Sequence, residues 1–117
     1  MRDSPEGRVV DAVLAFLKLK NVFAWRNNSG ATVAGEGASR RFVRYGLVGS
    51  SDILGILPDG QFLGIECKSP TGRTTKAQEA FLDEIEGRGG LAILARDVND
   101  VLCAFGKYRH GYTWRKH

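Results

Sequence analysis

The chain has 117 residues, 43% of them hydrophobic, which is enough for one modest core in a single domain spanning residues 1–117. It has neither the apolar stretch of roughly 7 to 15 residues that marks a signal peptide nor the run of about 18 that crosses a membrane. We therefore expect a soluble intracellular protein. Because Cys67 and Cys103 lack metal-ligand spacing and a nearby histidine cluster, neither a zinc site nor a disulfide framework is expected.

The net charge of +4 is concentrated in two segments. Residues 107–117 hold four Lys or Arg and no acid, whereas the rest of the chain is balanced. A second acid-free stretch, residues 37–51, contains Arg40, Arg41 and Arg44. The C-terminal segment also carries aromatic rings that could lie against sugars or bases: Tyr108, Tyr112 and Trp114. The pattern suggests a polyanionic partner, although a solvated loop and a frayed terminus would have the same composition.

The first predicted element is a helix from Ser4-Pro5 to about Lys20. Serine is a favoured N-cap and proline a favoured first helical residue. Apolar residues then follow at helical spacing: Val9, Val10, Val13, Phe16 and Leu17. Glu6 lies at the edge of this apolar face. It is either a solvated glutamate favoured by the helix dipole or a residue that points into a site.

Three strands and a long loop are expected between residues 22 and 68. Residues 22–27 read as a strand, and the glycine-rich residues 28–49 read as a loop of the length that is usually functional or mobile. Residues 51–57 and 61–68 are strand-like and are joined by Pro58-Asp59-Gly60. This tripeptide matches a type I turn closed by a left-handed glycine, which makes a three-residue hairpin loop.

The remaining elements alternate helix and strand. Thr75 and Gln78 form a capping box for a helix that Gly89-Gly90 ends. Residues 91–95 read as a strand covered on both faces, and Asp97 caps a short helix to about Ala104. The predicted fold is α/β, with helices on a mixed central sheet and a right-handed crossover that makes strands 61–68 and 91–95 parallel.

The turn decides which acidic residues meet. If Leu57 pairs with Gln61, the numbers of paired residues sum to 118, and Asp52 lies directly opposite Glu66 on one face of the sheet. Lys68 points to that same face, and Cys67 points to the other. A two-residue turn would instead place the two acids on different faces.

Opposed carboxylates repel each other and need a partner when they are buried. Mg²⁺ or Mn²⁺ suits Asp52, Glu66 and a backbone carbonyl, that of Cys67, as ligands. Lys68 would then orient a water molecule or stabilise negative charge during phosphodiester cleavage. Gln78 points inward and could bind a metal-bound water, although helix capping accounts for it nearly as well. An exposed Asp/Glu/Lys salt-bridge cluster is the alternative for the acidic and basic residues.

Residues 49–95 resemble the VRR-NUC family, a branch of the PD-(D/E)xK nuclease superfamily, and the similarity extends from Glu6 to about Val101. The resemblance implies the restriction-endonuclease-like fold. It also implies a catalytic set at Asp52, the Glu66-Cys67-Lys68 triplet, Gln78 and Glu6, with Glu6 as a possible metal ligand. Trp25-Arg26-Asn27-Asn28 looks like the family's second element, whose polar residues face the site.

The resemblance further implies a metal-dependent, structure-selective endodeoxyribonuclease. We expect a stand-alone phage or prophage protein in the bacterial cytoplasm that resolves Holliday junctions as a homodimer. Alternatives are a nuclease for flaps or other branched DNA, a non-catalytic DNA-binding module, and a restriction-type enzyme. The residues expected to contact DNA are Arg26, Asn28, Arg40, Arg41, Arg44, Ser51, Arg73 and Lys76.

Overall fold

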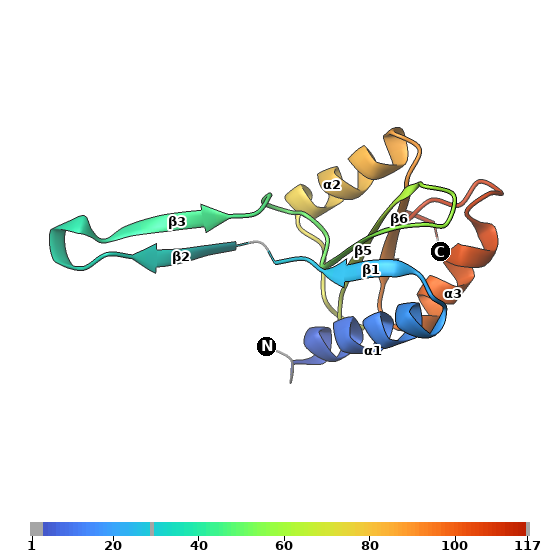
Figure 1. Cartoon of the computed structure of the whole chain (residues 1–117), viewed down its shortest axis with the longest axis horizontal. Coiled ribbons are helices and arrows are strands. Elements are labelled where there is room, and N and C mark those ends of the chain that lie inside the picture. The colour runs from blue at the N-terminus through green and yellow to red at the C-terminus, as the bar shows by residue number, and fades with distance from the viewer. Residues whose placement is uncertain (1–3, 29, 117) are drawn as a thin grey trace.

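The computed structural model describes residues 4–28 and 30–116, and it is an α/β fold with a protruding hairpin (Figure 1). In chain order the elements are α1 (Pro5–Leu19), β1 (Phe23–Arg26), β2 (Gly30–Ala34), the 3-10 turn η1 (Gly37–Ser39), β3 (Arg41–Tyr45), β4 (Ile53–Ile56), β5 (Phe62–Cys67), α2 (Lys76–Gly87), β6 (Leu91–Ala95) and α3 (Val98–Lys107). The central sheet has the order β1-β4-β5-β6, and β2 and β3 form a separate two-stranded sheet.

Helices cover both faces of the central sheet. Helices α1 and α3 pack on one face, where they bury the larger core cluster, and α2 packs on the other face (Figure 1). Strand β6 is buried along its whole length, as expected for a strand between two helical layers. No helix within residues 4–28 and 30–116 has both the length and the apolar character needed to cross a bilayer.

The helix starts follow the capping residues expected from the sequence. Ser4 Oγ accepts a hydrogen bond from Gly7 N at 2.9 Å at the start of α1. The capping box of α2 is present in both directions: Gln78 N donates to Thr75 Oγ1 at 3.2 Å, and Thr75 N donates to Gln78 Oε1 at 2.9 Å. Helix α3 begins after Asp97, as expected, and ends three residues later than the expected end at Ala104.

The β4–β5 hairpin has the three-residue turn expected at Pro58-Asp59-Gly60. Leu57 N donates to Gln61 O at 2.9 Å, and Gly60 adopts the left-handed conformation with a φ of 91°. Paired residues run from Ile56 opposite Phe62 to Ile53 opposite Ile65, so their numbers sum to 118 as predicted. Strands β5 and β6 are parallel, which confirms the crossover connection.

The expectation of a long loop at residues 28–49 is wrong. Most of this segment is an antiparallel hairpin, β2–β3, which we call the arm (residues 30–45), and it extends away from the body (Figure 1). The molecule measures 55 × 30 × 27 Å as a result. A ladder of backbone hydrogen bonds therefore organises residues whose composition is that of a loop.

The structure fits neither interpretation of the C-terminal segment, as a frayed terminus or as a tail whose Trp114 ring lies free for DNA. Trp114 is only 4% exposed and packs with Leu82 and Ile85 of α2. Its indole Nε1 donates to Asp83 Oδ1 at 3.0 Å, and its backbone N donates to Glu86 at 2.7 Å. Two further rings pack against the larger core cluster, those of Tyr108 and Tyr112. The C-terminal segment is thus part of the core.

Candidate metal centre

Three carboxylates converge at the end of the sheet where β5 ends and α1 begins. Glu6 lies in the first turn of α1, Asp52 lies just before β4, and Glu66 lies near the end of β5. One oxygen from each lies within 4.8 Å of the other two. The structure therefore brings these three acids together.

The hairpin register accounts for the position of Asp52. Continuing the ladder of β4 and β5 by one residue places Asp52 opposite Glu66, so both side chains share a face. Asp52 Oδ2 also accepts a hydrogen bond from Cys67 N at 2.8 Å, which fixes the orientation of the carboxylate. The Cys67 side chain points the other way, into the core formed with α1 and α3, as predicted.

Glu66 carries the strongest electrostatic conflict in the site. Its side chain is buried, with a residue exposure of 1%, and its Oε1 atom finds no hydrogen-bond partner among the residues that the structure places. Burial, together with the charge and hydrogen bond of Asp52, raises the pKa of Glu66 to about 9, against the opposing effect of Lys68. A carboxylate here needs either a proton or a cation. The orphaned oxygen beside two other carboxylates fits a hard divalent ion.

Lys68 completes the cluster. Its Nζ lies 3.7 Å from Glu66 Oε2 and 3.8 Å from Glu6 Oε2, and the residue is only 7% exposed. An ordinary salt-bridge cluster on an exposed sheet face would leave these groups in water. Because Glu66 and Lys68 are both buried, the geometry disfavours that alternative.

The comparison with known protein families bears directly on this constellation. The sequence model of the VRR-NUC domain matches residues 5–98, a range that includes Glu6, Asp52, Glu66 and Lys68. The chain belongs to the VRR-NUC family. VRR-NUC domains have a PD-(D/E)xK-like fold, and membership implies a nuclease, with DNA as the substrate. None of the curated proteins compared with the chain matches it.

Gln78 of this VRR-NUC domain has the capping role. It is half-buried in the first turn of α2, and its carboxamide oxygen is bound to Thr75 N. The structure thus shows the helix-capping explanation at work. A contact between its amide group and a water in the site stays a prediction.

The residues expected to contact DNA fall into two groups. Exposed side chains are those of Arg26, Asn28, Arg40, Arg41, Arg44, Arg73 and Lys76, of which Arg26 also lies 3.8 Å from Asp11 Oδ1. Ser51 differs because it is fully buried and lies against Gly64 of β5. Its side chain does not reach the surface, so the expectation of a DNA contact at Ser51 does not fit the structure.

Asn27, which the resemblance placed among polar residues facing the site, supports the backbone around Asp52. Its backbone N donates to Asp52 O at 2.8 Å, and its Nδ2 donates to Ser50 Oγ at 2.7 Å and to Ser51 O at 3.0 Å. Asn27 therefore holds the segment that delivers Asp52. Residue numbers of paired β1 and β4 residues sum to 79, which also places Asn27 beside Asp52, but this register had no local turn to reveal it.

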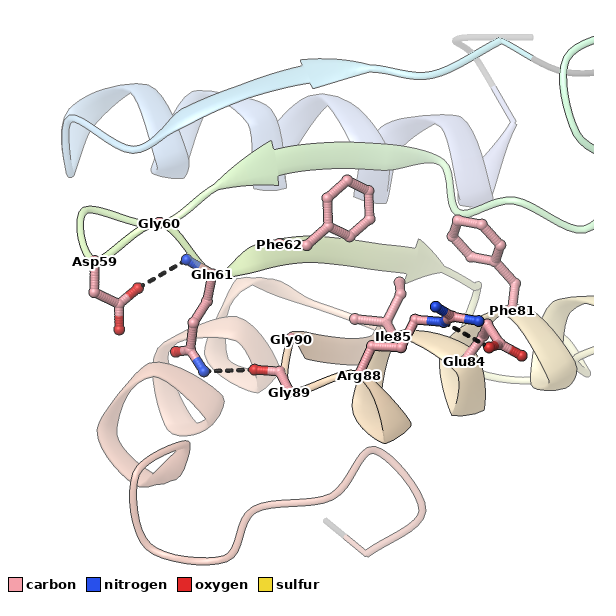
Figure 2. A pocket seen from close by; sticks show the side chains of 10 residues that line it. All are labelled: Asp59, Gly60, Gln61, Phe62, Phe81, Glu84, Ile85, Arg88, Gly89 and Gly90. Carbon is pink, nitrogen blue, oxygen red and sulfur yellow. Dashed lines mark hydrogen bonds and ion pairs between the residues drawn. The ribbon is translucent and has the colours of Figure 1, made fainter.

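A pocket of about 520 Å³ lies at the other end of β5 from the carboxylates (Figure 2). It is formed by the start of β5 and the C-terminal half of α2, and its apolar lining includes Phe62, Phe81 and Ile85. None of the three clustered acids lines it. The pocket is an apolar surface feature separate from the nuclease site.

Proposed function

We propose that this protein is an endonuclease that hydrolyses DNA phosphodiester bonds with Mg²⁺ or Mn²⁺. The observation that carries the proposal is the convergence of Glu6, Asp52 and Glu66 beside the buried Lys68. Nucleases of this fold usually use divalent ions, and hard ions of this type prefer oxygen ligands. The donor set is therefore suited to the chemistry.

The ligands would be the three carboxylates and the backbone carbonyl of Cys67. A bound ion would polarise the scissile phosphate and lower the pKa of a water molecule. Asp52 enters this arrangement already oriented by its hydrogen bond from Cys67 N. Such preorganisation reduces the rearrangement needed when substrate binds.

Lys68 has the position of a charge-stabilising residue. Its ammonium group is buried beside two carboxylates and can donate to an attacking water or to a phosphate oxygen. A fixed positive charge in a site with little water stabilises the negative charge that develops during hydrolysis. The proposed role of Lys68 is thus electrostatic and orienting.

We further propose that the substrate is a four-way DNA junction and that the enzyme acts as a homodimer. Two strands must be cut in a symmetric junction, and a chain with one site meets this demand through two-fold pairing. An apolar row supports pairing: Phe23, Ile56 and Phe62 lie side by side across β1, β4 and β5, and all are exposed. Exposed contiguous apolar surface is typical of an interaction site.

The test is cleavage of labelled four-way junction, flap, splayed-arm and linear DNA with Mg²⁺ or Mn²⁺. Lys68→Ala should lower the junction cleavage rate roughly 100- to 1000-fold, the usual effect of removing one charge-stabilising group, with DNA binding retained. Lys18→Ala, at an exposed lysine of α1, is the matched control and should cleave normally. Failure of the unaltered protein to cut any substrate would overturn the proposal, and a preference for flaps would overturn its junction part.

A further inference from the structure

Strand β3 of the arm has no buried residue on either face. Figure 1 shows the arm projecting alone from the end of the body, and exposed side chains occur along it: Phe42 is 79% exposed, and Val33 and Tyr45 are also exposed. A two-stranded ribbon is at best marginally stable in water by itself. The arm is therefore expected to be stabilised by contact with a binding partner.

The charge of the arm indicates the class of partner. Arg40, Arg41 and Arg44 are exposed, and no carboxylate in the described part of the chain forms an ion pair with them. Glu36 is the only acid in residues 30–45. A surface with three uncompensated guanidinium groups complements the phosphates of a nucleic acid.

The distribution of side chains over the two faces points to a groove. Successive strand residues alternate between faces, so Phe42 and Arg44 share one face while Arg41 and Tyr45 share the other. Each face thus has one arginine and one aromatic ring. A two-stranded ribbon in a DNA groove has a phosphate backbone on each side and can use both of its faces. A surface that binds single-stranded DNA by stacking has its aromatic rings on one face.

The root of the arm is fixed beside the carboxylates. One end leaves from β1 through Asn27, and the other returns through Gly49 to Asp52. Gly49 has a φ of 84° and packs so closely on α2 that an added Cβ would lie 2.6 Å from the Ala77 carbonyl. The direction of the arm is therefore coupled to the position of the site.

We propose that the arm lies in a groove of duplex DNA on one side of the phosphate that is cut. This rests on the proposed nuclease function and adds the form of DNA required next to the cut. A five-residue strand such as β3 is about 17 Å long, which corresponds to roughly five base pairs. The enzyme therefore requires a duplex flank of about that length or longer on the side of the arm.

The test measures binding separately from cleavage. The full-length protein carrying Glu66→Gln serves as a non-cleaving background. Its affinity is measured for four-way junctions whose duplex branches are shortened one at a time. Phe42→Ala should weaken binding roughly tenfold, as expected for the loss of one apolar contact in a groove. Replacement of Arg40, Arg41 and Arg44 by alanine should reduce the salt slope of binding by about two to three. Leu19→Ala, an exposed apolar residue of α1, is the matched control.

The outcomes separate this inference from the proposed function. The inference is supported if the variants of the arm bind DNA more weakly and if shortening one duplex branch of the junction below about five base pairs also weakens binding. This holds even if the unaltered protein cuts nothing. Unchanged affinity in the variants overturns it. The inference is also overturned if the arm variants change the molecular mass of the protein in solution without changing DNA binding, because the arm would then contact a second copy of the chain. Equal loss of affinity for single-stranded DNA excludes the groove.

Discussion

The Glu66 carboxyl group is buried and lies next to the carboxylate of Asp52. Burial is the main reason that its pKa rises to about 9, and the neighbouring Asp52 adds to the effect. In the metal-free protein a proton on Glu66 relieves this conflict. The same carboxyl group is therefore both a source of instability near neutral pH and the feature that makes the site attractive to a cation.

Glu66→Gln should make the metal-free protein more stable at pH 8 than the unaltered protein. The unfolded chain releases the Glu66 proton near pH 4.5, whereas the folded chain holds it until about pH 9. Stability is therefore lost as the pH rises between these values, and glutamine removes this dependence. Thermal unfolding with a chelator should show a gain on the order of a few kcal/mol at pH 8 and little gain at pH 5. A variant as pH-sensitive as the unaltered protein would contradict the assignment.

Asn27→Ala should lower kcat more than it changes KM. The substitution removes the two side-chain hydrogen bonds that hold Ser50 and Ser51, and with them the placement of Asp52. A misplaced catalytic group typically costs about tenfold or more in rate. Steady-state cleavage kinetics measure this effect. Asn28→Ala at the neighbouring exposed position should instead raise KM alone, and identical effects from both variants would argue against positioning.

At the residue scale, the sequence was informative where a short turn fixes geometry. Asp52, Glu66 and Lys68 could be placed on one face because only Pro58-Asp59-Gly60 separates the two strands. Asn27 could not be found in this way. Its partner Asp52 is 25 residues away, and the arm between them conceals the register of β1 and β4.

Elements that bury one or both faces were predictable, and elements that bury neither were not. Helix α1 and strand β6 have the apolar patterns that packing demands. Strand β3 of the arm buries neither face, so it lacks the alternation of a half-buried strand, and the glycines of the segment resemble those of a loop. The C-terminal segment is held by one buried tryptophan and its polar contacts, which have no periodicity to detect.

Trp114→Ala should destabilise the fold rather than weaken DNA binding. Trp114 fills the space between the C-terminal segment and α2, and truncation of a buried tryptophan costs about 3 to 5 kcal/mol. Denaturant unfolding measures the loss. Lys116→Ala, at an exposed position of the same segment, should leave stability nearly unchanged. The opposite pattern, with normal stability and weaker DNA binding after Trp114→Ala, would restore the idea of a DNA-binding tail.

At the scale of the whole molecule, one half of a sheet face is left open. Helix α2 covers β5 and β6 (Figure 1), whereas Phe23 and Ile56 on β1 and β4 stay exposed beside Phe62. The face that bears Asp52 and Glu66 continues directly into this apolar row. The sequence showed apolar residues in these strands but not the strand order that leaves them uncovered.

Phe23→Asp should convert the proposed dimer to a single chain. Phe23 is 69% exposed, so an aspartate there is tolerated in the monomer but would be costly in an apolar interface. The molecular mass in solution, measured by light scattering, should fall by half. The variant should no longer cut both strands of a junction together. Leu19→Asp, at an exposed position outside the row, is the control. A protein that is a single chain before any substitution would contradict the homodimer.

The Pro58-Asp59-Gly60 turn lies about 20 Å along β4 from Asp52, yet its length sets the pairing of Asp52 with Glu66. A gene that gained or lost one codon here would encode the same acids, but Asp52 would face the opposite side of the sheet. Substitutions that preserve three residues would leave the pairing intact. Natural selection on this nuclease should therefore tolerate amino-acid substitutions in the turn and reject insertions and deletions.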